Sequence, residues 1–320
     1  MGPMSIGPAP RSATSPATAK TLPAAGRFAP SPSGDLHIGN VRSGILAYLF
    51  AKTSGRDFLW RVEDLDRVKR GAAERQLADM AGLGIVPDAP PVYQSHRTAH
   101  YAEALERLAE HGLVYECYCS RKDIQQAPTA PHQPPGAYPG TCRDLDPAVR
   151  EAERRRLAAA GRLPALRLRS DLAVHHITDV LLGPVQSTVD DFVLRRGDGV
   201  WAYNLAVVVD DGLMGVDQVV RADDLADSAP RQAYLADLLG FRKPTYAHVP
   251  LVLGPTGARL AKRDGAVTLR QLGDTDFDIW SWTGTSLGFG PWHSLDEAVA
   301  RFDPERMVEC PTTFIPPARA

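Results

Sequence analysis

The hydrophobic positions of this chain follow two alternating patterns, which predict strands and helices in succession. Residues 58–62, FLWRV, form a short and mainly apolar run of the kind found in a buried strand, and residues 249–253 form another. Elsewhere apolar residues recur at the spacing of an amphipathic helix, in residues 36–49, 72–83, 99–111, 267–273, 278–287 and 295–302. Strands that alternate with helices predict an α/β fold with a largely parallel sheet.

One junction between a strand and a helix is especially informative. Gly26 to Asn40 have the sequence GRFAPSPSGDLHIGN, in which residues 30–34 interrupt regular structure between an apolar strand end and a helix start. The first turn of a helix offers unpaired N–H groups and a positive dipole end, which suit a phosphate. His37 could donate to a phosphate oxygen, and Gly39 leaves room for a nucleotide against the backbone. An ordinary strand–helix turn with a solvated histidine is the alternative.

A basic loop late in the chain supplies a complementary group. Residues 259–265, RLAKRDG, follow the apolar run at residues 249–253 and place Lys262 between two arginines. On one α/β framework, this loop and the turn at His37 could hold a triphosphate from two sides.

These two segments resemble the signature regions of class I aminoacyl-tRNA synthetases, and their flanking residues resemble the glutamyl branch. RFAPSPSGDLHIGN is similar to the region of the HIGH signature, and RLAKR is similar to the KMSKS loop. Asn40 replaces the second histidine of the first signature. Arg259, Ala261 and Arg263 replace the first lysine and both serines of the second, whereas Lys262 keeps the second lysine position.

The resemblance covers residues 27–265 and implies a Rossmann-type parallel sheet, an inserted zinc-containing subdomain and a short helical C-terminal region. It implies that His37 and Lys262 stabilise the phosphates of ATP in the transition state. Gly39 and Asn40 would complete the ATP site, and Mg²⁺ would bind with ATP. Because Asn40 can donate a hydrogen bond but cannot carry charge, its share of catalysis would differ from that of a histidine.

Three further residues are candidate substrate ligands. Glu63 follows the apolar run at residues 58–62, where open α/β sheets bind ligands, and it could hold an ammonium group or cap the next helix. Tyr203 lies near the start of the apolar segment 201–211, a strand or a helix, where core packing is the alternative role. Arg221 lies between an apolar strand end and two aspartates with which it could simply pair.

The resemblance assigns these residues to a glutamate pocket. In the family, the residues that align with Glu63, Tyr203 and Arg221 bind the amino-acid substrate, and the arginine faces its side-chain carboxylate. A planar guanidinium suits that role because it binds a carboxylate through two parallel N–H groups. Arg27 and Ser31, from the first signature region, complete the predicted glutamate-binding set.

Three of the four cysteines lie close together in the sequence. Cys117 and Cys119 form a C-x-C pair, and Cys142 follows a proline-rich stretch at residues 128–139. Such clustering favours a metal site in a reducing compartment over a disulfide framework. Zinc takes four ligands, usually thiolate or imidazole, and chemistry alone nominates His132 as the fourth. Three unrelated buried cysteines are the alternative.

The glutamyl-queuosine branch of the family, which this segment resembles, instead implies Tyr138, in YPGTC, as a phenolate ligand. We therefore expect one structural Zn²⁺ held by Cys117, Cys119, Tyr138 and Cys142, with His132 as the alternative fourth ligand.

Composition limits the possible functions without selecting one. The 320 residues are 44% hydrophobic and 23% charged, with a formal net charge of −2, as in an ordinary globular protein of one large domain or two. RNA contacts would therefore depend on local patches such as the arginines of residues 150–169, which could equally form a solvated helix face. No apolar run approaches the ~20 residues of a membrane span. The absence of G-x-G-x-x-G after the first strand argues against a nicotinamide dinucleotide site.

The order of these features suggests a division of the chain. We expect a disordered tail at residues 1–25 and a Rossmann catalytic domain in two halves, at residues 26–105 and 196–265. An inserted zinc-containing subdomain, residues 106–195, would separate the halves, and a helical C-terminal region would follow at residues 266–320. The tail lacks the apolar region of a secretory signal. Ordinary glutamyl-tRNA synthetases carry a further helical region that binds the anticodon, whereas this chain ends soon after the lysine loop.

This combination resembles the branch that activates L-glutamate with ATP and transfers it to the queuosine base in the anticodon loop of tRNA(Asp). The alternatives are a truncated glutamyl-tRNA synthetase that charges a tRNA 3′ end, an enzyme that activates an amino acid for a non-tRNA acceptor, and a non-catalytic RNA-binding module. We expect a cytoplasmic monomer without membrane contact.

Overall fold

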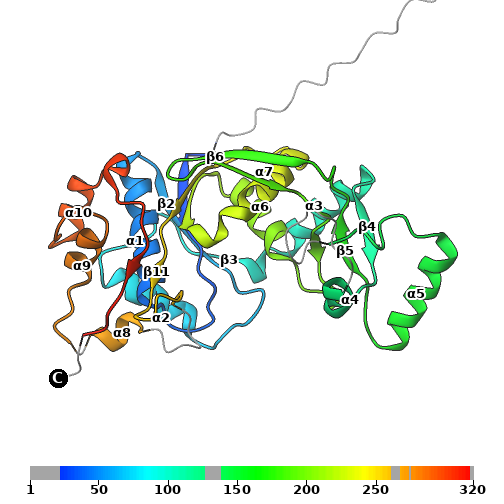
Figure 1. Ribbon diagram of the computed structural model, residues 1–320, viewed down its shortest axis with the longest axis horizontal. Helices are drawn as coiled ribbons and strands as arrows, with labels where there is room; N and C mark the ends of the chain where they lie inside the picture. Colours follow the sequence, from blue (N-terminus) through cyan, green and yellow to red (C-terminus); the bar gives the residue numbers. More distant parts are fainter. Residues whose placement is uncertain (1–21, 127–137, 261–266, 274, 318–320) are drawn as a thin grey trace, which may run out of the picture.

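Figure 1 shows the computed structural model of the chain, which describes residues 22–126, 138–260, 267–273 and 275–317. Its centre is a seven-stranded sheet of order β3-β2-β1-β9-β10-β6-β7. The strands are β1 (Ala25–Phe28), β2 (Asp57–Val62), β3 (Val92–Tyr93), β6 (Val174–Asp179), β7 (Gly183–Thr188), β9 (Val216–Ala222) and β10 (Thr245–Val249). Every pair from β3 to β6 is parallel, and the edge strand β7 is antiparallel to β6. The predicted α/β fold with a mostly parallel sheet is confirmed.

The inner strands are buried along their length because both faces of the sheet are covered. All four residues of β1 are buried, as is every residue of β9 except Ala222. The main helices are α1 (Ile38–Thr53), α2 (Ala72–Ala81), α3 (Thr98–Glu110), α6 (Tyr203–Leu213) and α7 (Ala229–Leu238). The apolar positions predicted at helical spacing just before and within α1 are all buried; they are Leu36, Ile38, Val41, Ile45, Leu46 and Leu49.

The strand order reverses between β1 and β9. From β1 the chain continues to β2 and β3 on one side, whereas β9 is followed by β10 on the other. Ligands of open α/β sheets bind beyond the carboxyl ends of the strands at such a switch point. Arg27, near the end of β1, and Arg221, near the end of β9, both belong to this edge of the sheet.

A smaller antiparallel sheet forms a second body beside the main one. It consists of β4 (Val114–Cys117), β5 (Ala165–Leu168) and β8 (Val193–Arg195), and it is accompanied by α4 (Arg121–Gln126) and α5 (Pro147–Ala159). In Figure 1, α5 lies at the end of the molecule opposite to the C-terminal helices. The hairpin β6–β7 also comes from the segment predicted as an insertion, yet it extends the main sheet beside β10. The proposed division into domains stays a prediction, and residues 1–21 of the predicted tail lie outside the described residues.

The C-terminal part is helical, as predicted, with α8 (Leu269–Leu272), α9 (Ile279–Ser286) and α10 (Leu295–Arg301). Its last strand, β12 (Thr312–Thr313), pairs with β11 (Val252–Leu253). The remaining short elements are the 3₁₀ turns η1 (Gln94–His96), η2 (Asp223–Ser228) and η4 (Pro304–Arg306). The apolar run at residues 249–253 divides between β10 and β11, because Pro250 cannot donate to a strand ladder. Among the described helices, none is both long and apolar enough to cross a membrane.

Candidate active site

A cavity of about 770 Å³ opens at the switch point of the sheet. Its wall comes from β1, the loop after it, α1, the segment after β2, α6 and β9. Seven predicted site residues line it: Arg27, Ser31, His37, Asn40, Glu63, Tyr203 and Arg221. The fold therefore brings the predicted glutamate-binding residues and two of the predicted ATP-binding residues to one place.

Hydrogen bonds that its backbone carbonyls accept from other segments hold the loop between β1 and α1 in place. The amide of Glu63 donates to Pro30 O at 3.1 Å, and the amide of Lys69 donates to Pro32 O at 2.9 Å. The side chain of Gln76, buried on α2, donates to Gly34 O at 2.6 Å. These bonds satisfy the carbonyls of an irregular segment and fix where Ser31 and His37 lie.

His37 is the N-cap of α1 rather than a residue of its first turn. Its Nδ1 accepts from the amides of Gly39 at 3.1 Å and Asn40 at 3.2 Å. Since Nδ1 accepts, the proton of the neutral ring is on Nε2, which is a donor. A Cβ atom at position 39 would lie 3.1 Å from two atoms of the His37 ring, so glycine allows this cap. The helix end therefore offers the imidazole, not the amides of residues 39 and 40, to a ligand.

The described residues on both sides of the lysine loop lie at this site. Ala258, Arg259 and Leu260 line the cavity, and Arg259 forms an ion pair with Asp224. Ala261, Lys262 and Arg263 lie outside the described residues. Where the description resumes, Val267 O accepts from the amide of Ile38 at 3.1 Å, and the amide of Leu269 donates to Leu36 O at 3.2 Å.

Tyr203 and Arg221 lie together in the predicted glutamate pocket. Tyr203 is 41% exposed at the start of α6 and lines the cavity, so it is not a core residue. Arg221 is 7% exposed; its Nη1 donates to Tyr203 Oη at 3.4 Å and to Gln232 Oε1 at 2.8 Å. Its Nη2 donates to Leu225 O at 3.2 Å, and its Nε donates to His248 Nε2 at 3.0 Å. Among the described residues, every hydrogen-bond acceptor of this guanidinium is an uncharged group, provided that His248 is neutral.

Arg27 and Glu63 rest on a buried ionic cluster. Arg61, which is fully buried, donates to Asp211 Oδ1 at 2.5 Å and to Glu63 Oε1 at 3.2 Å. Arg27 Nε reaches the same oxygen of Asp211 at 3.3 Å. Burial alone would raise the pKa of Asp211, but Arg61 and Arg27 outweigh it and lower that pKa. For Glu63, burial prevails over both arginines and raises the pKa of the carboxyl.

A second aspartate anchors this cluster to α3. Asp210 accepts from Arg97 Nε at 2.5 Å, Gln94 Nε2 at 2.8 Å and Tyr101 Oη at 2.8 Å. Sequence analysis did not identify Arg61, Asp210, Asp211 or His248. A charge inside an apolar strand and two acids at the end of an apolar helix were available signals, because a buried charge requires a partner. The sequence around His248 carries no comparable signal.

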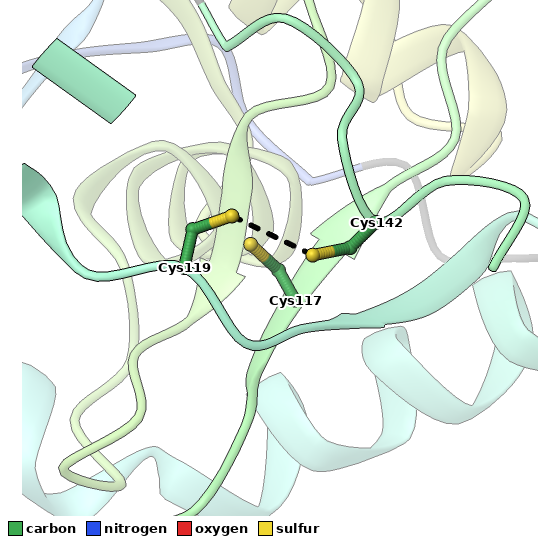
Figure 2. Close-up of side chains that lie close together, drawn as sticks. All are labelled: Cys117, Cys119 and Cys142. Atoms are coloured by element: carbon green, nitrogen blue, oxygen red, sulfur yellow. Dashed lines mark hydrogen bonds between the residues drawn. The ribbon is translucent and has the colours of Figure 1, made fainter. Parts of the chain in front are cut away.

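The cysteines come together as predicted, as Figure 2 shows for Cys117, Cys119 and Cys142. Their sulfur atoms all lie within 4.8 Å of one another, and Cys119 Sγ is 3.5 Å from Cys142 Sγ. Tyr138 is buried, with its hydroxyl oxygen 3.4 Å from Cys117 Sγ, and it accepts from the amide of Cys142 at 2.8 Å. His132 lies outside the described residues.

This donor set fits a closed, four-coordinate structural metal site. Three sulfur atoms and one phenol oxygen converge from β4 and from the chain around residues 138–142. Hydrogen bonds within the cluster lower the pKa of the Cys117 thiol and raise the pKa of Cys119, and burial together with such bonds raises the pKa of Tyr138. Of these three groups, only Cys117 therefore favours its anionic form before a metal binds. The guanidinium of Arg167 lies 3.6 Å from the centre of the Tyr138 ring and adds a positive charge beside these ligands.

Comparison with known proteins identifies relatives over most of the chain. Residues 24–287 match the family described as tRNA synthetases class I (E and Q), catalytic domain. A glutamyl-Q tRNA(Asp) synthetase from Nocardia farcinica is 59% identical over 292 residues, which cover 90% of this chain and 92% of the relative. One from Cutibacterium acnes is 49% identical over 273 residues, 83% of this chain and 76% of the relative.

The fold is also shared with solved structures. A glutamate tRNA ligase from Elizabethkingia meningosepticum superposes with a TM-score of 0.74 over 92% of this chain and 67% of that chain. A glutamate-tRNA synthetase from Elizabethkingia anophelis gives the same TM-score over 92% of this chain and 68% of that chain. At 24% identity in both cases, these structures support the architecture alone.

Proposed function

The chain belongs to the class I tRNA synthetase family of the E and Q type, a family of ligases, and from this premise we propose that it is a glutamyl-Q tRNA(Asp) synthetase. The reaction would form glutamyl-adenylate from glutamate and ATP and then transfer glutamate to the queuosine base of tRNA(Asp). Relatives 49–59% identical that carry this name support the acceptor. The observation that supports glutamate as the substrate is the contact of Arg221 with Tyr203, in the cavity that Glu63 and His37 also line.

The pocket offers a complementary group for each charge of glutamate. Arg221 retains one Nη2 proton without a described acceptor, because its four described hydrogen bonds use the other N–H groups. The hydroxyl of Tyr203 accepts from Arg221, so its own proton is directed elsewhere and can reach the same carboxylate. These two donors suit the side-chain carboxylate, and Glu63, when ionised, suits the ammonium group.

In the first step, an oxygen of the α-carboxylate would attack the α-phosphorus of ATP. A new P–O bond forms, the bond from that phosphorus to the bridging oxygen breaks, and pyrophosphate leaves with the electron pair. The Nε2–H of His37 is directed by its cap on α1 and would donate to the phosphates as charge develops. Lys262 would add a positive charge from the other side, and Mg²⁺ bound with ATP would neutralise phosphate charge.

In the second step, a hydroxyl of the queuosine base would attack the activated carbonyl carbon. The ester forms as the bond to AMP breaks, and the hydroxyl proton leaves with AMP or passes to water. Positioning the two reactants is the main contribution of the protein to such a step. The Arg27–Asp211–Arg61–Glu63 cluster supports this role, since it holds two pocket residues in fixed places.

The cysteine cluster would hold one structural Zn²⁺, with Tyr138 as the fourth ligand. Zinc at that position would tie β4 to the segment around Cys142 and thereby order the smaller sheet. The site contains no open position for a substrate if all four ligands bind.

Transfer of labelled glutamate tests the proposal. The protein would be incubated with ATP and tRNA(Asp) prepared with and without queuosine. Label that requires queuosine and survives removal of the 3′-terminal adenosine would agree with the proposal. Label that requires the 3′ end and ignores queuosine would instead mean a charging enzyme. Pyrophosphate exchange without label on either tRNA would mean a non-tRNA acceptor.

A further inference from the structure

We propose that His248 and Asp179 are positioning residues that orient Arg221 and preserve its charge for an acidic substrate side chain. This inference rests on the proposed glutamate pocket and adds to it two residues that do not line the cavity. The three side chains form a buried chain with exposed fractions of 2% for Asp179, 0% for His248 and 7% for Arg221.

The strand register brings the three residues together. In the pairing of β10 with β9, His248 is directly opposite Arg221. In the pairing of β10 with β6, Tyr246 is opposite Asp179. Asp179 is the last residue of β6, and β6 pairs with β10. The carboxylate of Asp179 therefore lies beside His248. Residues that are far apart in sequence thus occupy neighbouring places at the carboxyl edge of the sheet.

Asp179 is held as an ionised acceptor. Its carboxylate accepts from the amides of Leu181 at 2.9 Å and Leu182 at 3.0 Å, and from the amide of His248 at 3.1 Å. Burial alone would raise the pKa of Asp179, but the His248 side chain and these amides prevail and keep that pKa below its usual value. A carboxylate in this state can only accept hydrogen bonds.

The tautomer of His248 follows from its two neighbours. Nδ1 lies 2.6 Å from Asp179 Oδ2, which only accepts, so Nδ1 carries a proton. Nε2 lies 3.0 Å from Nε of Arg221, which only donates, so Nε2 is the unprotonated acceptor. A neutral imidazole with its proton on Nδ1 satisfies both contacts. The Nε–H of Arg221 is therefore directed toward His248, while its Nη1 faces Tyr203 and Gln232 and its Nη2 faces the carbonyl of Leu225.

The neutral imidazole also keeps Arg221 out of direct contact with an acid. Throughout the described part of the chain, no carboxylate oxygen lies within 4.0 Å of the Arg221 nitrogen atoms, whereas Arg27 and Arg61 both contact Asp211. The negative charge of Asp179 balances the positive charge of Arg221, and the His248 ring lies between them. A carboxylate in place of that ring would neutralise Arg221 and weaken its attraction for the substrate carboxylate. Selectivity for glutamate over uncharged glutamine would then fall.

Two substitutions separate the roles of the two ring nitrogens. In His248→Gln the side-chain oxygen can replace Nε2 as the acceptor for Arg221, while the contact with Asp179 is lost. In His248→Asn the amide can replace the Nδ1–H donor to Asp179, while the contact with Arg221 is lost. A role limited to joining β10 and β6 would make the Asn variant the milder one, whereas a positioning role makes the Gln variant the milder one.

The measurements are the KM for glutamate, the KM for ATP and the kcat/KM ratio of glutamate to glutamine, from amino-acid-dependent pyrophosphate exchange with tRNA(Asp) present. We expect His248→Asn to raise the KM for glutamate at least ~10-fold, the effect of losing one hydrogen bond to a charged group. The KM for ATP should change little, and the ratio of glutamate to glutamine should fall. His248→Gln should show a smaller effect. Asp179→Asn should also raise the KM for glutamate, because an amide cannot accept from all the donors that surround Asp179.

His175→Asn is the matched control, because His175 lies near the surface on β6, the strand that also carries Asp179, and its Nε2 contacts Asp171 at 3.0 Å. Thermal melting verifies that each variant is folded at the assay temperature. An unchanged glutamate KM in His248→Asn, equal damage in both His248 variants, or parallel increases in both KM values would overturn the inference alone. Wild-type protein without glutamate-dependent exchange would instead overturn the proposed function and this inference with it.

Discussion

The amide of Ile38, in the first turn of α1, donates to the carbonyl of Val267 across 3.1 Å. Ile38 follows His37, and Val267 is the first described residue after the lysine loop. Leu260, the last described residue before Lys262, lines the cavity. The described residues on both sides of this segment therefore lie at the active site, next to the imidazole that the first signature supplies.

Replacing Lys262 by alanine should slow adenylate formation. Loss of one positive donor to the transition state typically lowers kcat by a factor of at least ~100. We expect a decrease of that size in glutamate-dependent pyrophosphate exchange. Lys52→Ala is the control, because Lys52 contacts Asp88 at the other end of α1, and its exchange rate should match the wild type. Equal rates for Lys262→Ala and wild type would exclude the catalytic role.

Replacing Arg221 by alanine should damage glutamate binding selectively. The side chain supplies the cation of the predicted pocket, so the KM for glutamate should increase far more than the KM for ATP, by at least ~10-fold. Steady-state kinetics in both substrates measures this. Arg56→Ala is a suitable comparison, since Arg56 binds Asp217 on the same strand β9 outside the cavity. Equal increases in both KM values would contradict the assignment of Arg221.

As the pH falls, glutamate binding should weaken at a higher pH than it would if the pKa of Glu63 had its ordinary value. Burial raises the pKa of Glu63 above its usual ~4.3. As the pH falls through that raised value, Glu63 becomes protonated and can no longer attract the substrate ammonium, so the KM for glutamate should rise. Glu63→Gln should have a higher KM at neutral pH and a flatter profile. The side-chain carboxylate of glutamate also titrates, but it does so identically in both enzymes, so identical profiles would argue against Glu63.

The cysteine cluster should bind one zinc per chain. Metal analysis of purified protein should find about one Zn²⁺, and Cys117→Ser should lose most of it, because the site would be left with three ligands. Cys310 is the natural control: it is exposed and lies outside the cluster, so Cys310→Ser should retain the metal. Wild-type protein that is fully stable without any metal would refute the site.

The fourth zinc ligand can be determined by two substitutions. Tyr138 is buried with its oxygen 3.4 Å from Cys117 Sγ, whereas His132 is the ligand that chemistry alone suggested. Tyr138→Phe should therefore release zinc to a chelator faster than wild type, because the substitution removes only the oxygen. His132→Ala should release zinc at the wild-type rate. The opposite pattern would assign the site to His132.

Local patterns were sufficient for the features that depend on neighbouring residues. The helix of residues 38–53, the strand ending before Glu63 and the clustered cysteines all follow from short-range spacing. One expectation changed in detail, since His37 caps α1 instead of lying inside its first turn. Tyr203 lines the cavity, which excludes the alternative role in core packing. Both depend on how a side chain is directed, which periodicity does not specify.

By itself, the sequence determined the α/β class, the family resemblance and the predicted site residues that line the cavity, because each belongs to a short segment with a recognisable pattern. Only the tertiary structure showed that Arg221 contacts His248 and Asp179, and that Arg61 joins Arg27 to Glu63 through Asp211. These contacts join strands and helices that are distant in sequence. Strand order and register determine which residues contact one another. Both depend on the packing of the whole sheet and cannot be predicted from any single segment.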